Sequence, residues 1–186
     1  MRKLPAFPGF PETGARARES HFESLARVIV YQQLSGKAAA TIFGRACRLT
    51  PGARFPKATE WLALPEADVR ACGISSAKAR ALADLSERAT DGRLGLGAAA
   101  RLQDAVLIER LVQVRGIGVW SAQMFLIFKL GRLDVLPSGD LGIQEGLRLL
   151  DGLAERPSPA QVEARGAAWR PLASVAAWYL WHLTDA

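Results

Sequence analysis

The chain has 186 residues, of which 49% are hydrophobic, enough for one domain, or one domain with two lobes, around a sizeable core. A formal net charge of +6 favours an anionic partner such as nucleic acid. The sequence has no signal-peptide pattern, no long apolar run and only two, widely spaced cysteines (Cys47 and Cys72), so we expect a soluble, cytoplasmic protein with free thiols and no membrane partner.

Helical spacing accounts for most of the first half of the chain. Residues 1–19 are rich in Pro, Gly and Arg and are predicted to be irregular. Ser20 and Glu23 form a capping-box pattern, which predicts a helix that ends near residues 32–36. Further elements are predicted from apolar spacing and glycine content: helices over 37–49, 59–64, 66–71 and 76–90, the last capped by Ser75, and a loop over 92–97.

Helical spacing continues in the second half. Two short apolar-faced segments meet at Gly116, and a helix over about 140–150 follows them. A capping box at Ser158 starts the next helix, and a last helix carries Trp169, Trp178 and Trp181. The sequence contains no run of alternating β-branched residues, so we predict an all-α fold.

The most informative stretch is the turn between the two short segments, Arg115-Gly116-Ile117-Gly118-Val119. Helices joined by so short a turn need glycine, because glycine reaches positive φ at low cost. The turn leaves the first amides of the second helix without helical partners, and such amides bind phosphate oxygens. The pattern is that of a helix-hairpin-helix, which binds a nucleic-acid backbone without reading its sequence. Arg115 is a candidate for a further phosphate contact, although a solvated surface arginine is nearly as common.

A Gly/Pro loop follows this hairpin and ends at Asp140, whereas Asp134, nearer the hairpin, is predicted to be structural. Hairpin, loop and acid together resemble the helix-hairpin-helix–GPD superfamily of DNA glycosylases, and residues 20–182 resemble the catalytic core of its AlkA-type (3-methyladenine DNA glycosylase II) members. The resemblance implies a two-lobed helical glycosylase domain over residues 20–186, with the active-site cleft between two interleaved lobes. AlkA-type proteins usually begin with an additional small α/β domain, which we expect this chain to lack because there is no room for it before Ser20.

The resemblance implies that Asp140 is the catalytic residue of a monofunctional DNA glycosylase in base excision repair, acting on alkylated purines such as 3-methyladenine and 7-methylguanine. The target base must first be flipped out of the duplex. The carboxylate would then stabilise the positive charge that develops on the sugar as the base departs. An aspartate in this context is also typical of a helix N-terminus, where the helix dipole stabilises it.

Aromatic side chains suit the walls of a pocket for a cationic purine, because electron-rich rings stack well on cations. The candidate pocket residues are Trp120, Trp181, Tyr31, Tyr179 and Met124, the last one turn beyond Trp120. Core packing is the competing interpretation for each of them.

Further expectations follow from the same resemblance. Gln33 and Leu34 lie where the family places the side chain that fills the gap left by the flipped base, although a glutamine at a helix end can equally cap the helix or face solvent. Trp120 occupies the position of the lysine nucleophile of bifunctional members, and two cysteines cannot hold the iron–sulfur cluster of others. We therefore expect no lyase activity and no cofactor.

The family hairpin often holds a monovalent or alkaline-earth cation through backbone carbonyls, here those of Gln113, Val114, Gly116 and Gly118, and no side-chain metal site is expected. The expected partner is double-stranded DNA with alkylation damage, bound by a nucleoid-associated monomer. Two alternatives remain open: a mismatch or oxidised-base glycosylase of the same superfamily, and a non-enzymatic helix-hairpin-helix DNA-binding module.

Overall fold

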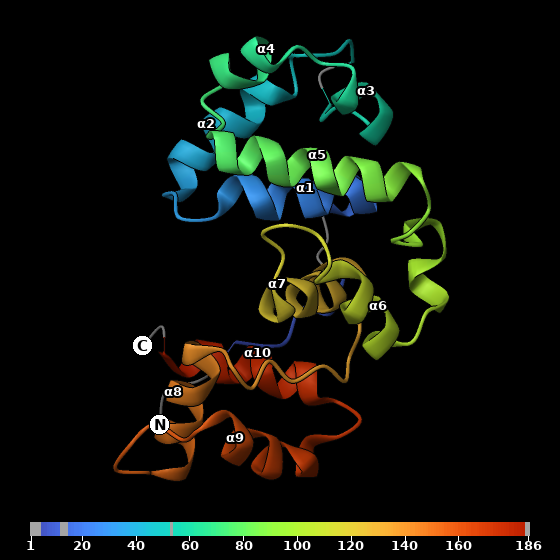
Figure 1. The fold of residues 1–186 in the computed structure, drawn as a ribbon. Coiled ribbons are helices and arrows are strands. Elements are labelled where there is room, and N and C mark those ends of the chain that lie inside the picture. The colour runs from blue at the N-terminus through green and yellow to red at the C-terminus, as the bar shows by residue number, and fades with distance from the viewer. Residues whose placement is uncertain (1–4, 12–14, 53, 185–186) are drawn as a thin grey trace. The chain divides into compact units, whose positions relative to one another are not determined.

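The computed structural model describes residues 5–11, 15–52 and 54–184, and every regular element among these residues is a helix (Figure 1). The all-α prediction is therefore confirmed. The chain divides into two compact units, one formed by Gly14–Ala122 and the other by Met1–Thr13 together with Gln123–Ala186. No helix in the described ranges combines the length and the apolar character needed to cross a bilayer.

The Gly14–Ala122 unit is organised around α5 (Ser76–Thr90), which runs alongside α1 (His21–Tyr31) in Figure 1 and also contacts α3 (Ala58–Leu62) and α4 (Glu66–Ala71). Leu25 of α1 and Leu82 of α5 are fully buried where these helices meet. The other elements of the unit are η1 (Ala15–Arg18), α2 (Gly36–Ala46), η2 (Leu96–Arg101), α6 (Asp104–Leu111) and the first residues of α7 (Val119–Met124). The 3-10 helix η2 thus begins within the stretch that was predicted to be a loop.

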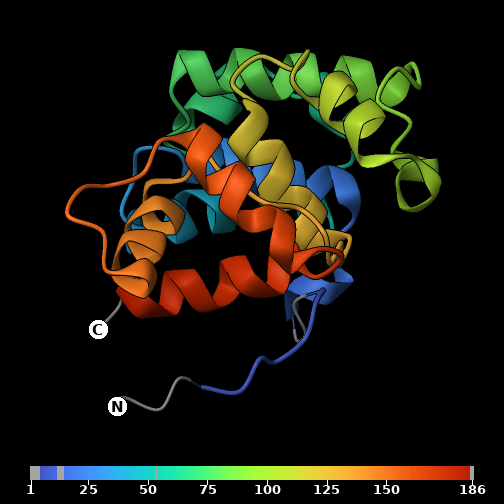
Figure 2. The same cartoon turned by 90° about the horizontal axis from the view of Figure 1, so that it is seen from below.

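The other unit is built on the packing of α8 (Leu141–Asp151) against α10 (Ala173–Thr184), which lie side by side in both ribbon views (Figures 1 and 2). The remaining elements are the π-helical turn η3 (Phe125–Lys129), α9 (Pro159–Gly166) and η4 (Ala167–Trp169). Its core is made of buried apolar side chains: Leu136, Ile143, Leu147, Val162, Ala173, Ala177 and Leu180.

Serine caps start three helices where the sequence predicted them. Ser20 Oγ accepts a hydrogen bond from the Glu23 N–H at 3.0 Å, and Ser75 Oγ accepts one from the Lys78 N–H at 3.3 Å. A complete capping box opens α9 at Ser158. Each cap satisfies an amide that has no partner within its helix, and these predicted starts are confirmed.

The prediction of one C-terminal helix that includes Trp169 is wrong. Trp169 ends the short helix η4, and α10 begins only at Ala173. Pro171 lies between them, and proline lacks an amide hydrogen and disfavours a helical conformation at the preceding residue. The carboxylate of Asp134 accepts a hydrogen bond from the Ala173 N–H at 3.3 Å and pairs with Arg170 at 2.8 Å, which fixes the start of α10.

The close packing of α8 on α10 depends on a glycine. A Cβ at Gly146 would collide with the carbonyl group of Leu180, which belongs to the backbone of α10. A backbone carbonyl cannot rotate away as a side chain can, so the two helices would have to separate.

We predict that Gly146→Ala lowers the free energy of unfolding by about 1–3 kcal/mol, the usual result of forcing extra atoms into a packed interior. Helix propensity alone would favour alanine by about 1 kcal/mol, so the sign of the change reports the clash. The matched control is Gly44→Ala, because a Cβ at Gly44 inside α2 would meet nothing within 4 Å. Denaturant unfolding measures both variants, and equal stabilisation of the two would contradict the prediction.

Candidate functional site

The turn between α6 and α7 forms the predicted hairpin. Within it, the Ile117 N–H donates to Val114 O at 3.0 Å. Gly116 has a φ of +81°, a left-handed conformation that glycine adopts at little cost. The Ala122 N–H donates to Gly118 O at 3.0 Å, which starts the helical hydrogen bonding of α7 directly after the turn.

The hairpin residues that were predicted to bind DNA differ in exposure. Arg115, Gly116, Gly118 and Val119 are exposed. Ile117 is only 4% exposed and its amide is used inside the turn, so this residue shapes the hairpin from within. Gly118 lacks the positive φ and the crowding that a tight turn would impose, since a Cβ there would meet no protein atom within 4 Å. The geometry of the turn itself therefore requires glycine at Gly116 but not at Gly118.

Asp84 of α5 holds one side of the hairpin. Its Oδ2 accepts a hydrogen bond from the Arg115 N–H at 2.7 Å, and its Oδ1 accepts one from Arg88 Nε at 2.8 Å. Burial alone would raise the pKa of Asp84, but the hydrogen bonds from Arg115 and Arg88 outweigh it and keep this pKa below its usual value of 3.8. The ionised carboxylate therefore fixes the backbone of the turn at neutral pH.

Gln32, which follows α1, holds another point of the same turn. Its Nε2 donates a hydrogen bond to Gly116 O at 2.7 Å. The carbonyl oxygens of Gln32 and Val30 in turn accept hydrogen bonds from Lys78 Nζ at 2.8 and 2.7 Å. Desolvation lowers the pKa of the Lys78 amine. The end of α1 is thus tied both to α5 and to the hairpin.

The two residues predicted to fill the gap in the duplex, Gln33 and Leu34, lie in the turn between α1 and α2. Both are exposed, and Gln33 has a φ of +55°, which is uncommon for a residue other than glycine. Backbone strain of this kind is found at functional sites. The neighbouring Gln32 was not among the predicted site residues, because its contact with the hairpin joins residues 84 positions apart.

Asp140 lies at the N-terminus of α8 and caps its first turn. Its Oδ1 accepts two hydrogen bonds of 2.9 Å, one from the Ile143 N–H and one from Trp181 Nε1–H. The helix-cap interpretation of this aspartate therefore holds, and the second donor adds a contact that capping does not require. Two fixed donors on one oxygen give the half-buried carboxylate a defined orientation.

Two neighbours allow Trp181 to reach Asp140. A Cβ at Gly142 would lie 2.9 Å from Trp181 Cδ1 and 3.0 Å from Asp140 Oδ1, closer than side chains pack, so the glycine leaves room for the indole. Trp181 also stacks on Phe128, with ring centroids 5.8 Å apart. Gly142 was not among the predicted site residues. A glycine inside a helix is unfavourable by about 1 kcal/mol, so its presence next to a candidate acid is itself a signal.

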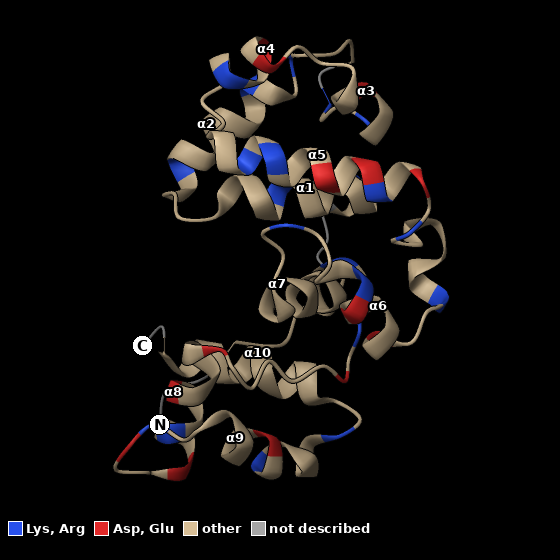
Figure 3. Ribbon diagram, in the orientation of Figure 1, with Lys and Arg blue, Asp and Glu red and all other residues tan. Residues whose placement is uncertain are grey.

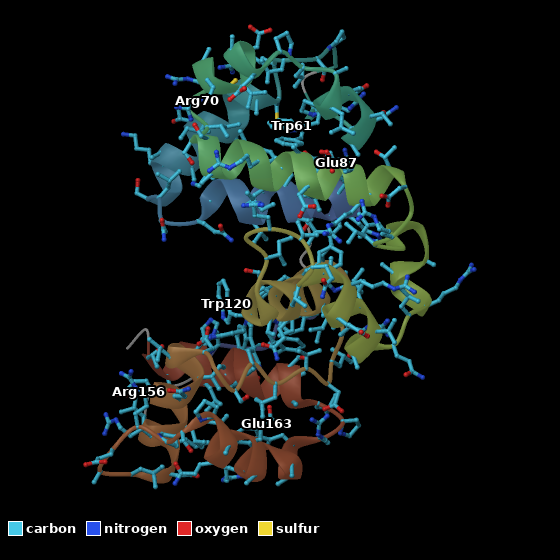
Figure 4. All side chains as sticks on the ribbon, viewed as in Figure 1. Trp61, Arg70, Glu87, Trp120, Arg156 and Glu163 are labelled. Carbon is cyan, nitrogen blue, oxygen red and sulfur yellow. The ribbon has the colours of Figure 1, made fainter. Side chains whose placement is uncertain are left out.

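Two of the predicted pocket residues belong to the Gly14–Ala122 unit. Trp120 is 50% exposed and projects from α7 (Figure 4), which differs from the usual burial of a tryptophan in a core. Tyr31 is half-buried, with its ring edge-on to Phe43 and its hydroxyl accepting a hydrogen bond from Arg27 at 3.1 Å. Trp120 thus fits a surface that meets a ligand better than Tyr31 does.

The other predicted pocket residues belong to the unit that contains Asp140. Met124 and Tyr179 are both half-buried. Tyr179 packs edge-on against Trp178, with ring centroids 5.0 Å apart. Because residues two apart on a helix point about 200° from each other, Tyr179 and Trp181 lie on different sides of α10.

Charged side chains of both signs lie along α5 (Figure 3), and the Asp84–Arg88 pair is among them. Within the described ranges, no group of three or more His, Cys, Asp or Glu side chains could hold a metal ion. Cys47 and Cys72 are free thiols, and burial raises the pKa of both, which lowers their reactivity.

Comparison with known proteins places the chain in a family. The sequence profile described as "HhH-GPD superfamily base excision DNA repair protein" matches residues 26–171, a range that includes the hairpin and Asp140. The chain belongs to this superfamily. The predicted resemblance is thereby confirmed, and the hairpin of this HhH-GPD protein is the element after which the superfamily is named.

Named relatives and solved structures agree with the superfamily. DNA-3-methyladenine glycosylase 1 of Schizosaccharomyces pombe is 38% identical over 165 residues, which cover 88% of this HhH-GPD chain and 72% of the relative. The structure of 3-methyladenine DNA glycosylase from the same organism, in complex with abasic DNA, matches with a TM-score of 0.78 and 34% identity over 96% of this chain and 87% of that one. A DNA-3-methyladenine glycosidase from Bacillus halodurans matches with a TM-score of 0.81 and 38% identity over 88% and 75% of the two chains.

We predict that Asp84→Ala loosens the hairpin. Removing the carboxylate leaves the Arg115 amide without its acceptor, and the loss of a charged hydrogen bond lowers the free energy of unfolding by about 1–2 kcal/mol. Hydrogen exchange at the Arg115 amide should accelerate. The control is Asp91→Ala, since Asp91 pairs with Arg93 and is not bound to the hairpin by any contact described here.

The same substitution should change the pH dependence of stability. Because the pKa of Asp84 is lowered in the folded protein, its contribution is present above the unfolded value of 3.8 and is lost as pH falls through the folded value. The stability difference between the parent and Asp84→Ala should therefore be full well above pH 3.8 and shrink as the pH falls below that value. Urea unfolding at several pH values measures it, and a difference independent of pH would refute the role of the ionised carboxylate.

Proposed function

We propose that this protein is a monofunctional DNA glycosylase that hydrolyses the N-glycosidic bond of alkylated purines, such as 3-methyladenine and 7-methylguanine, in duplex DNA. Membership of a superfamily of base excision DNA repair proteins supports the reaction class. Relatives named DNA-3-methyladenine glycosylase support the substrate class. The observation that carries the proposal is the orientation of Asp140 by Trp181, at the position after the hairpin where the superfamily resemblance expects the catalytic acid.

The chemistry requires a carboxylate close to the sugar of a flipped nucleotide. As the C1′–N bond breaks, the electron pair leaves with the base and positive charge develops on the sugar. The Asp140 carboxylate stabilises that charge and orients the attacking water. Trp181 and the Ile143 amide both hold Oδ1 of this carboxylate, so the acid needs little reorganisation when charge develops.

An alkylated purine with a positive charge is already a good leaving group, so the enzyme needs to flip it, stack it and stabilise the sugar. Trp120 and Trp181 are the pocket walls we propose, and cation–π contact with either ring would contribute about 0.5–2 kcal/mol to binding of the flipped base. The exposure of Trp120 and the contact of Trp181 with Asp140 support these roles. Tyr31, Met124 and Tyr179 stay predictions as further lining residues.

The hairpin, in this proposal, binds the DNA backbone through the exposed turn around Gly116 and Gly118, with Arg115 and Val119 beside it. Gln33 or Leu34 fills the gap left by the flipped base. A monovalent or alkaline-earth cation fits the turn, because the carbonyl oxygens of Val114, Gly116 and Gly118 each accept one hydrogen bond and retain a second lone pair. Such an ion would neutralise a phosphate at the contact.

Three further features belong to the proposal. The DNA carries alkylation damage, the enzyme acts as a monomer, and it works in the cytoplasm in association with the nucleoid. A phosphate-binding hairpin that reads no sequence fits an enzyme that must search all DNA for rare lesions. Light scattering of the free protein and of its DNA complex measures the oligomeric state.

The experiment that tests the proposed function is the release of free base from methylated duplex DNA by the purified protein. Release of 3-methyladenine or 7-methylguanine supports it. Binding to the same duplex without any release would favour the non-enzymatic DNA-binding module. Faster release of a neutral lesion such as 8-oxoguanine would favour a mismatch or oxidised-base glycosylase.

We predict that Asp140→Asn lowers the single-turnover rate of base release by about 10²–10³-fold, because the variant loses the charge that stabilises the sugar cation. Asparagine still offers an oxygen to Trp181 and to the Ile143 amide, so the fold and DNA affinity should be retained. Asp151→Asn at the other end of α8 is the control, since Asp151 pairs with Arg165 on the protein surface. A folded Asp140→Asn enzyme of near-parental rate would overturn the assignment.

We predict that the reaction stops at an abasic site. A Schiff base with the sugar needs a free amine, and the sequence has Trp120 where bifunctional members place their lysine. The Lys78 amine is bound to the carbonyl oxygens of Val30 and Gln32. Borohydride should therefore trap no protein–DNA adduct under conditions in which a bifunctional glycosylase gives one, and an adduct mapped to any lysine of this chain would contradict the prediction.

A further inference from the structure

Residues 5–11, which we call the N-terminal strap, pack onto the unit that contains Asp140. Phe7 and Phe10 of the strap meet edge to face, with ring centroids 4.9 Å apart. Phe7 contacts Trp178 of α10 at 5.5 Å, and Phe10 contacts Phe128 of η3 at 5.4 Å, both edge-on. The strap has no helix of its own, so these rings are its main hold on the unit among the contacts described.

A close backbone approach holds the strap at its other end. A Cβ at Gly131, just after η3, would lie 2.7 Å from Pro11 Cδ and 2.9 Å from Pro11 N. Gly131 has a φ of +71°, and its N–H donates to Ile127 O at 3.2 Å. The turn after η3 is therefore shaped so that the strap can lie directly on it.

Phe128 connects the strap to the candidate active site. Phe10 meets the ring of Phe128 edge-on, and the ring of Phe128 stacks on Trp181 with an interplanar angle of 26°. Trp181 Nε1 then donates the 2.9 Å hydrogen bond to Asp140 Oδ1. Four side chains thus form an unbroken series of direct contacts from the strap to the acid.

We propose that Phe10 is a positioning residue for the reaction of Asp140. The strap braces Phe128, Phe128 fixes the plane of the Trp181 indole, and the indole N–H fixes the carboxylate. The inference rests on the proposed function. Hydrogen bonds weaken steeply with distance and angle, so a small rotation of an unbraced Trp181 is enough to release Asp140.

The alternative is that the strap adds only apolar contact and therefore only stability. The two roles predict different rates for a variant that lacks both the Phe10 ring and the indole N–H of Trp181. Trp181→Phe keeps a ring to stack on Phe128 but removes the donor to Asp140. A residue that acts through this donor has little further effect once the donor is gone, whereas an independent stabilising contact acts additively.

The test is a double-mutant cycle of Phe10→Ala and Trp181→Phe, measured as the single-turnover rate of 7-methylguanine release and the affinity for duplex DNA. We expect Phe10→Ala to lower the rate by about 10-fold at unchanged affinity, because displacing a catalytic carboxylate by a fraction of an ångström lowers a rate by roughly this factor. The double variant should be no slower than Trp181→Phe within about 2-fold. Phe10→Tyr, which keeps the ring, should restore the rate.

The control for general destabilisation is Val69→Ala, which removes buried carbons from α4 in the Gly14–Ala122 unit, whereas the four side chains of the series belong to the other unit. It should lower the melting temperature and leave the rate unchanged. Additive rate losses in the cycle, or a loss in Val69→Ala equal to that in Phe10→Ala, would overturn the positioning role while base release by the parent still supports the proposed function.

A second readout is independent of catalysis. The near-ultraviolet circular dichroism of tryptophan depends on the packing of its ring. Phe10→Ala should therefore change the tryptophan band of the parent more than that of Trp181→Phe, in which Trp178 still contacts the strap through Phe7. If the parent releases no base, the proposed function fails and this spectrum still tests the coupling. An equal change in both backgrounds would show that Phe10 does not act on Trp181.

Discussion

The hydrogen bond from Trp181 Nε1 to Asp140 Oδ1 is the interaction on which the candidate active site depends. It forms because α10 approaches α8 closely enough for an indole to reach the first turn of α8. Two glycines allow this approach, since a side chain at Gly142 would meet the indole and one at Gly146 would meet the backbone of Leu180. Both glycines lower the intrinsic helix propensity of α8, so packing against α10 outweighs the local preference. The acid is oriented before a substrate binds, which is the preorganisation that stabilisation of a cationic sugar requires.

The hairpin is also held in one conformation before a partner binds, in this case by hydrogen bonds to its backbone. Its backbone amide at Arg115 and its carbonyl at Gly116 are each bound by a side chain from outside the turn, Asp84 and Gln32. A turn held in this way presents its exposed residues in one conformation, so less entropy is lost when a partner binds. Lys78 extends the arrangement, because it holds the carbonyl end of α1 from which Gln32 projects. Its amine is consequently engaged in structure, which agrees with chemistry that uses water and not a protein amine as the nucleophile.

Aromatic side chains serve two purposes in the unit that contains Asp140. Trp181 has one face for stacking and one N–H for a hydrogen bond, a combination that an aliphatic residue cannot supply. Phe128 and the rings of the N-terminal strap form edge and stacked contacts, and Trp181 also packs against the aliphatic core of the unit. Flat rings restrict one another in orientation as well as in distance. The unit therefore defines the direction of the Trp181 N–H more sharply than apolar burial alone would.

Local signals were sufficient for much of this protein. Serine caps placed the starts of three helices, Gly116 marked the hairpin, and the acid after it marked the start of α8, because capping and turn formation depend on residues a few positions apart. The sequence also predicted Trp181 as a pocket residue, but not its contact with Asp140, because that contact spans 41 positions and depends on how closely α8 and α10 pack. The hydrogen bond from Gln32 to the hairpin could not be predicted either. Gln32 and Gln33 are alike in type, and only the fold turns Gln32 toward the hairpin. Residues 1–19 were predicted to be irregular from composition. Only the tertiary structure decided that part of this segment packs within the unit that contains Asp140, because Phe7 and Phe10 contact rings more than 100 positions away in the sequence.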